Sequence, residues 1–107
     1  MSESNLSDEL VAKTIAVLLA KTQDATLKWE KYSDATYYLR LDIGTFRLAK
    51  DYDEVFELHA DYSSKESKRI AGIEYKEELK QLYAMAYNQN PNVENFIKSF
   101  IKKYYDF

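Results

Sequence analysis

The chain contains no cysteine, and this absence excludes disulfides, thiolate catalysis and metal sites with cysteine ligands. It also agrees with a reducing compartment, so we expect a cytoplasmic protein. Histidine and proline each occur once, and glycine occurs twice. Because so few residues break regular structure, we expect short connections built mostly from Asn, Asp and Ser.

Long apolar runs and basic segments are also missing. The longest apolar run, residues 15–20, is far shorter than the roughly 20 residues needed to cross a bilayer. Residues 1–10 are polar and acidic, so we do not expect a secretory signal peptide. The net charge is −3, so the chain as a whole does not attract nucleic acid or an anionic membrane electrostatically. The sequence therefore predicts no membrane partner and makes nucleic acid an unlikely one.

What the chain does contain is typical of one small globular domain spanning residues 1–107. Hydrophobic residues make up 46% of it and charged residues 31%, a balance found in folded rather than disordered proteins. At this length the core is small but needs no metal or disulfide to hold it. Tyrosine occurs ten times, and its apolar ring and polar tip suit both the rim of a core and a partner surface.

The N-terminal part predicts a helix over residues 7–22. Ser7 is a good N-cap, and Asp8 and Glu9 follow it at the positive end of the helix dipole. The apolar side chains recur at helical spacing and predict one buried stripe. This stripe comprises Leu10, Val11, Ile15, Leu18 and Leu19.

Residues 25–62 alternate apolar and polar side chains, which predicts an antiparallel meander of four short strands with one covered face. The strands are centred on residues 27–30, 37–42, 46–48 and 56–61. The side chains predicted to point inward are Leu27, Trp29, Tyr37, Leu39, Leu41, Phe46, Leu48, Phe56, Leu58 and Ala60. Residues 62–72 predict a polar loop, with a brief fifth extended segment at residues 70–73 left open.

Two further helices are predicted at the C-terminal end, over residues 75–88 and from Val93 to Tyr104. Asn90 is expected to cap the second of them, with Pro91 at its first position. Its apolar face comprises Val93, Phe96, Ile97, Phe100, Ile101 and Tyr104. We expect the two helices to form an antiparallel hairpin on the apolar face of the sheet. The predicted fold is a two-layer α+β domain with all helices on one side of a four-stranded sheet.

This order resembles a group of small uncharacterised bacterial proteins. The residues that carry the resemblance are Leu27-Lys28-Trp29-Glu30, Asp34-Ala35-Thr36-Tyr37-Tyr38, Phe46-Arg47-Leu48, Phe56-Glu57-Leu58 and Leu79-Lys80-Gln81-Leu82-Tyr83. The resemblance implies a bacterial or phage origin, a cytoplasmic location and the α+β arrangement. It implies no active site.

The side chains that carry chemistry do not form a recognisable catalytic set. There is no G-x-S-x-G or S-x-x-K motif, and Gly44 and Gly72 stand too far apart for a phosphate-binding loop. The acidic turn at residues 51–54 lacks the central glycine and distal glutamate of an EF-hand loop. Paired carboxylates among the 18 acidic residues could still act as acid and base. We expect a protein that is not an enzyme, with no catalytic residue, cofactor or metal.

The single histidine lies between two carboxylates on the outward side of its strand. The alternation places Glu57, His59 and Asp61 on the same face, where together they could hold a metal weakly. A metal site would normally need further histidine or cysteine ligands, and the chain has none. A solvated polar row explains the pattern without a ligand.

Binding is therefore the predicted role, with another protein or a second copy of the chain as the partner. The residues predicted to bind it lie on the outward side of the sheet and are Tyr38, Arg40, Arg47, Glu57 and His59. The wide apolar arc of the first helix, with Val17, and the terminal aromatics Tyr104, Tyr105 and Phe107 could be completed by a second copy.

The alternative is a regulator linked to nucleic acid. It would use the outer sheet face, where Tyr38, Arg40 and Arg47 could stack on bases, or the basic side of the last helix. That side comprises Lys98, Lys102 and Lys103.

Overall fold

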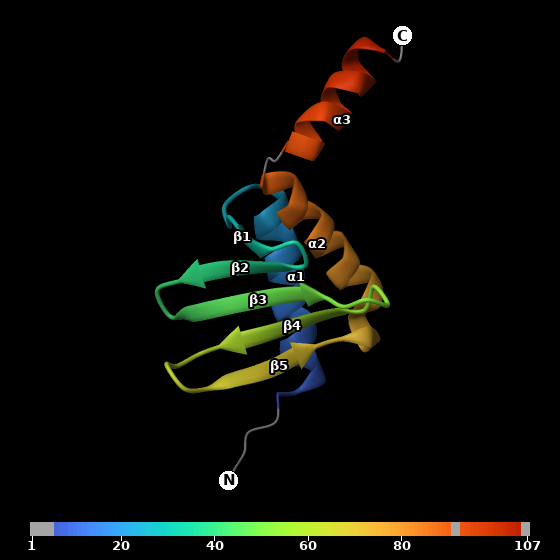
Figure 1. Cartoon of the computed structure of the whole chain (residues 1–107). Coiled ribbons are helices and arrows are strands. Elements are labelled where there is room, and N and C mark those ends of the chain that lie inside the picture. The colour runs from blue at the N-terminus through green and yellow to red at the C-terminus, as the bar shows by residue number, and fades with distance from the viewer. Residues whose placement is uncertain (1–5, 91–92, 106–107) are drawn as a thin grey trace.

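The computed structural model describes residues 6–90 and 93–105. Its elements, in chain order, are α1 (Asp8–Gln23), β1 (Glu30–Ser33), β2 (Thr36–Leu41), β3 (Gly44–Lys50), β4 (Phe56–Asp61), β5 (Ser67–Ala71), the 3₁₀ turn η1 (Ile73–Tyr75), α2 (Lys76–Gln89) and α3 (Val93–Tyr104). The strands form one antiparallel sheet in the order β1-β2-β3-β4-β5. Figure 1 shows α1 and α2 on the same side of this sheet.

The N-terminal helix forms as its sequence predicts. The Ser7 side chain accepts a hydrogen bond from the Leu10 N–H at 3.1 Å and so caps the first turn. Val11, Ile15 and Leu18 are buried, which confirms one side of the predicted stripe. Leu10 is half exposed, so the apolar arc of α1 is wider than the surface that covers it.

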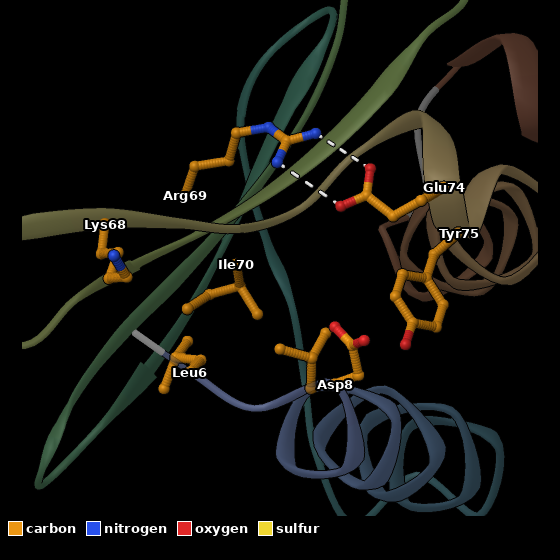
Figure 2. Close-up of a pocket in the computed structure, with 8 residues that line it drawn as sticks. Leu6, Asp8, Lys68, Arg69, Ile70, Glu74 and Tyr75 are labelled. Carbon is orange, nitrogen blue, oxygen red and sulfur yellow. Dashed lines mark hydrogen bonds and ion pairs between the residues drawn. The ribbon is translucent and has the colours of Figure 1, made fainter. Parts of the chain in front are cut away.

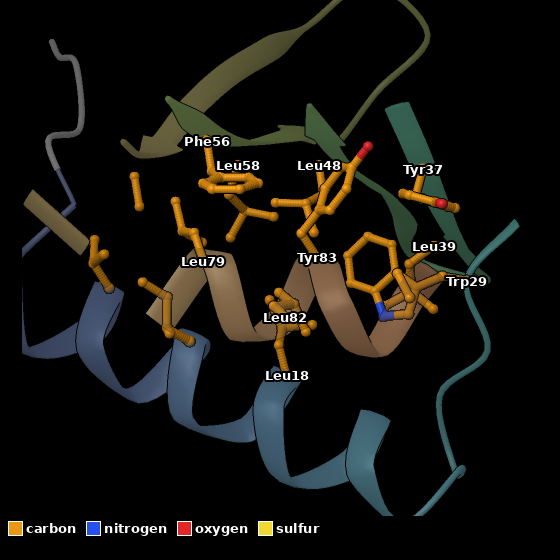
Figure 3. Close-up of a cluster of buried hydrophobic side chains, with 14 residues drawn as sticks. Leu18, Trp29, Tyr37, Leu39, Leu48, Phe56, Leu58, Leu79, Leu82 and Tyr83 are labelled. Carbon is orange, nitrogen blue, oxygen red and sulfur yellow. The ribbon is translucent and has the colours of Figure 1, made fainter. Parts of the chain in front are cut away.

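The core fills the space between the helices and one face of the sheet. Figure 3 shows the side chains of Leu48, Phe56 and Leu58 reaching from the strands toward Leu79 and Tyr83 of α2, with Leu18 of α1 below Leu82. The buried set is Val11, Ile15, Leu18, Trp29, Tyr37, Leu39, Leu48, Phe56, Leu58, Ala71, Leu79, Leu82, Tyr83 and Ala86. The predicted α+β class, with helices on one face of an antiparallel sheet, is confirmed.

The sheet differs from the prediction in its two edge strands. It has five strands, because residues 67–71 pair with β4. The prediction placed a polar loop at residues 62–72 and left open an extended segment at residues 70–73, which overlaps the end of this strand. The first strand begins at Glu30, three residues later than predicted, so Leu27 and Trp29 lie in the segment before it. Trp29 is nevertheless buried, because its indole N–H donates to the Thr22 hydroxyl at 2.9 Å and its ring joins the core.

The last helix differs from the predicted hairpin. Figure 1 shows α3 leading away from the sheet beyond the end of α2, and the chain measures 60 Å along its longest axis against 28 Å and 26 Å across. The apolar residues of α3 are exposed, from 45% for Ile97 to 76% for Val93. Two helices therefore cover the sheet in place of three. Asn90, which was predicted to cap the last helix, is the C-cap residue of α2, and its side chain donates to the Ala86 carbonyl at 2.7 Å. Pro91 and Phe107 lie outside the described residues.

The end of α2 is fastened to the segment that joins α1 to β1. The Gln89 side chain accepts a hydrogen bond from the Trp29 N–H at 2.8 Å and donates to the carbonyls of Leu27 at 2.9 Å and Thr22 at 3.2 Å. Asn90 donates to the Trp29 carbonyl at 3.0 Å. Because these hydrogen bonds join the end of α2 to backbone groups between α1 and β1, the two amide side chains fix how α2 meets the N-terminal half of the chain.

Burial of Tyr37 gives the fold a predicted response to alkali. Burial raises the pKa of the phenol to about 12 from its ordinary value of 10.0, because the low-dielectric core disfavours the phenolate. The folded state therefore holds this proton more tightly than the unfolded chain between pH 10 and pH 12. Stability should be unaffected below pH 10 and fall by roughly 2–3 kcal/mol as the pH rises through that window.

Urea unfolding between pH 9 and pH 12 measures this loss. Tyr37→Phe should remove most of the slope, leaving a contribution from Tyr83, whose pKa burial also raises. Tyr32→Phe is the matched control, since the Tyr32 side chain is 66% exposed. A slope that is the same in the wild type and in Tyr37→Phe would contradict the assignment.

Within residues 6–90 and 93–105, each helix is too short or too polar to cross a membrane.

Candidate functional site

The outer face of the sheet carries a row of polar residues that runs across all five strands. Antiparallel pairing places Glu30 opposite Tyr38, Tyr38 opposite Arg47, Arg47 opposite His59, and His59 opposite Arg69. Three of the five residues predicted to bind a partner therefore share one row. Arg40 and Glu57 lie two residues from this row on the same face.

At the β1–β2 end of this row, aromatic and charged side chains form a small exposed cluster. The rings of Tyr32 and Tyr38 stack at a centroid distance of 4.8 Å, and the Arg40 guanidinium lies 5.4 Å from the Tyr38 ring. Arg40 Nε donates to Glu30 Oε1 at 3.2 Å. Tyr32 was not among the predicted binding residues. Tyr32 follows Glu30 by two residues, so both side chains lie on the same side of the strand.

At the β3–β5 end, the cations of the outer face are paired with carboxylates. Arg47 Nη2 lies 3.5 Å from Asp61 Oδ1 and donates to the Ser67 hydroxyl at 3.2 Å. The hydrogen bond from Ser67, and then that from Arg47, lowers the pKa of the Asp61 carboxyl. The Asp61 carboxylate therefore binds side chains of the two neighbouring strands, Arg47 of β3 and Ser67 of β5, while His59 acts on it only through its charge.

His59 contacts one of the two predicted carboxylates. Its Nε2 lies 3.0 Å from Glu57 Oε1, and Arg69 Nε lies 3.9 Å from the other oxygen of Glu57. The Glu57–His59 contact is thus part of a chain of surface charge pairs. Among residues 6–90 and 93–105, no three His, Asp or Glu side chains gather in a way that could hold a metal ion. The absence of a metal and of a cofactor stays a prediction.

The acidic turn between β3 and β4 uses its first carboxylate to hold its own backbone. Asp51 Oδ1 accepts hydrogen bonds from the N–H groups of Asp53 and Val55, both at 2.9 Å. Glu54 in this turn has a positive φ of 58°. Asp51 therefore shapes the turn, as aspartate commonly does, and this accounts for its presence without a bound cation.

Figure 2 shows a small pocket between the start of α1 and β5. It has a volume of about 230 Å³. Arg69 and Glu74 form one wall, where Arg69 Nη2 lies 3.1 Å from Glu74 Oε1. The N–H of Glu74 itself and the Arg69 guanidinium lower the pKa of the Glu74 carboxyl. Lys68 and Asp8 add one further charge of each sign, so the pocket has no excess charge to attract an ion.

The most extensive exposed apolar surface among the described residues is on α3. Val93, Phe96, Ile97, Phe100, Ile101 and Tyr104 lie on one side of this helix, and we call them the α3 stripe. Each of them is at least 45% exposed. On another side Lys98 pairs with Glu94 at 2.8 Å. A monomer rarely leaves so continuous an apolar surface in water unless it binds something.

A second uncovered apolar surface lies beside α1, on the helix side of the sheet. This groove has a volume of about 430 Å³. We call it the α1 groove, and its lining residues are Leu10, Lys13, Thr14, Val17, Leu18, Lys21, Leu27, Leu41 and Phe46. Leu10 and Val17 are each about half exposed there. The groove exists because α1 and α2 together do not cover the end of the sheet where β2 meets β3.

No protein-family model matches this chain, and no curated protein or solved structure is significantly similar to it. The resemblance to small bacterial proteins thus gains no support from these comparisons.

Proposed function

We propose that this chain is a protein-interaction module without catalytic activity, and that α3 is its binding element. One observation carries the proposal: six apolar side chains on one face of α3 are all exposed. An amphipathic helix that lays its apolar face into a groove of a partner is a common mode of peptide recognition. The absence of cysteine agrees with a module that works in the cytoplasm.

The outer sheet face is the second surface of the proposed module. Its predicted binding residues are Tyr38, Arg40, Arg47, Glu57 and His59. We assign it a lesser role, because its charged groups largely satisfy one another and a partner would have to displace those pairs. The exposed ring of Tyr32 beside Tyr38 is the part of this face best suited to a protein contact.

The nucleic-acid alternative has one observation in its favour, the stacked pair Tyr32–Tyr38 with Arg40 beside it. Against it, Arg40, Arg47 and Arg69 each pair with a carboxylate, which cancels the field that phosphates would need. We therefore expect no mobility shift of nucleic acid at low salt. A shift that weakens steeply as salt is added would favour this alternative.

Hydrogen exchange of the α3 amides tests the proposed role directly. In dilute solution these amides should exchange at rates near those of an unfolded peptide, because a helix of 12 residues without a packing partner is marginal in water. The amides of α1 and α2 are the internal control and should be strongly protected, since both helices pack on the core. Strong protection of α3 that persists at every dilution would show its apolar face buried within one copy, and would contradict the proposal.

A further inference from the structure

The α3 stripe and the α1 groove are two apolar surfaces of one chain that are both uncovered. We propose that α3 of one copy docks into the α1 groove of a second copy, and that the reciprocal contact forms a twofold-symmetric homodimer. This inference rests on the proposed function of α3 as a binding helix and names its partner. It accounts for both exposed surfaces with a single contact.

The two surfaces match in length. The groove residues on α1 run from Leu10 to Lys21, and α3 runs from Val93 to Tyr104, so each side spans 12 residues. At about 1.5 Å per residue both are roughly 17 Å long. A third helix beside α1 would cover Leu41 and Phe46, the partly buried residues of β2 and β3 that α1 and α2 leave open.

The charges of both surfaces are compatible with this contact. Lys98 and Lys102 lie on the side of α3 away from the stripe, so docking leaves their ammonium groups in water. Lys13 and Lys21 line the groove, where their methylene stems can lie against a docked helix while their charges stay hydrated. Lys103 lies at the edge of the stripe, with its Nζ 5.5 Å from the centre of the Tyr104 ring, and its long stem lets the charge stay in water at the rim of the contact. Neither surface would then have to bury an unpaired charge.

The area favours a reciprocal contact over a single one. Taking about 200 Å² for a whole aromatic side chain, we estimate that the half-exposed α3 stripe offers about 500 Å² of apolar surface. Two contacts, each covering one stripe and a similar area of groove, would bury about 2,000 Å², at the upper end of the range of about 1,200–2,000 Å² for stable interfaces. One contact alone would bury about half of this and fall below that range.

The end of α2 favours docking of α3 into the α1 groove of a second copy over docking into the α1 groove of the same chain. Gln89 and Asn90 fasten the end of α2 to Leu27 and Trp29, and the next residue in the sequence is Pro91. Figure 1 shows α3 leading away from the sheet, beyond the end of α2 that these bonds hold. Pairing of α3 with α3 of a second copy is a further arrangement, but it would leave the α1 groove uncovered.

Light scattering coupled to size exclusion provides the test. The wild type should elute with twice the mass of a 12.6 kDa chain at high concentration and dissociate on dilution. Phe100→Glu in the stripe and Val17→Glu in the groove should each raise the dissociation constant by about 100-fold or more, because each dimer would bury the charged side chain twice in an apolar contact. In Val17→Glu the neighbouring Lys13 and Lys21 can pair with the new carboxylate only if their ammonium groups also lose water. Lys102→Ala, on the opposite side of α3, is the control and should leave the dimer unchanged.

Mixing the two glutamate variants identifies which surfaces meet. A Val17→Glu copy still has an intact stripe, and a Phe100→Glu copy still has an intact groove. The mixture should therefore associate more tightly than either variant alone, through one restored contact, but more weakly than the wild type, which has two. If Val17→Glu dimerises as well as the wild type while Phe100→Glu does not, α3 pairs with α3 and the proposal is overturned. Both side chains are about half exposed in one copy, and circular dichroism checks that each variant is folded.

Failure of this inference can be separated from failure of the proposed function. A wild type that stays monomeric at high concentration, with α3 amides that still exchange rapidly, would overturn self-association and leave α3 free for a different protein. A monomer whose α3 amides are protected would overturn both. A dimer in which α3 becomes protected only as the chain associates is the result that we expect.

Discussion

Replacing Tyr37 by alanine should lower the free energy of unfolding by about 3–5 kcal/mol, the usual effect of removing a buried aromatic side chain. The Tyr37 side chain is 1% exposed, and its ring meets the ring of Tyr83 edge-on at 5.1 Å. The loss combines the transfer of the ring to water with the cavity left between β2 and α2. Equilibrium unfolding in urea measures it.

The neighbouring residue is the matched control. Tyr38 lies on the outer face, where it contacts Tyr32 and Arg40, so Tyr38→Ala should cost no more than about 1 kcal/mol. Because successive side chains of a strand point to opposite faces, the two results together fix the register of β2. A larger loss for Tyr38→Ala than for Tyr37→Ala would mean that the register is shifted by one residue.

The second large effect is expected at Gln89. Gln89→Ala removes three hydrogen bonds, those with the Trp29 N–H and with the carbonyls of Leu27 and Thr22. The Thr22 carbonyl keeps the hydrogen bond from the Ala25 N–H at 3.1 Å, so the Trp29 N–H and the Leu27 carbonyl are the groups that lose most. Since each partly buried polar group left unpaired costs about 1–3 kcal/mol and water can reach some of them, we expect a loss of about 2–4 kcal/mol.

Gln81→Ala is the control for this change, because Gln81 is an exposed glutamine on the same helix. Its effect should stay within about 0.5 kcal/mol. The fluorescence of the single tryptophan offers a second measurement, since loss of the Gln89 contacts should loosen the packing of the Trp29 indole. Equal and small effects of both substitutions would show that the end of α2 is held by packing alone.

The sequence predicts which side chains of the central strands point to each face of the sheet, because side chains alternate between the two faces along a strand. Alternation around Tyr37, Leu48 and Leu58 is unbroken, and each of these residues is buried. The outward side of Arg40 and Arg47 follows from the same pattern. The pairings on that face could not be predicted, because the contact of Arg47 with Asp61 depends on which residues of two strands lie opposite each other.

The periodicity of the sequence did not predict the full extent of the edge strand β5 or the position of α3, and the reasons differ. Ser67 to Ala71 has mixed polarity, and it becomes a strand by pairing with β4. The periodic residues of α3 show that one face of the helix is apolar, and this was predicted correctly. Periodicity does not specify which surface covers that face, so the hairpin on the sheet was one interpretation among several.

Truncation of the chain after Asn90 tests the central claim most directly, namely that α1 and α2 close the core of one copy and α3 is left for binding. In dilute solution the unfolding curve of residues 1–90 should match that of the whole chain within about 0.5 kcal/mol, because the α3 stripe contributes nothing to the core. A loss of several kcal/mol on truncation would show that α3 covers its own domain and would contradict the account.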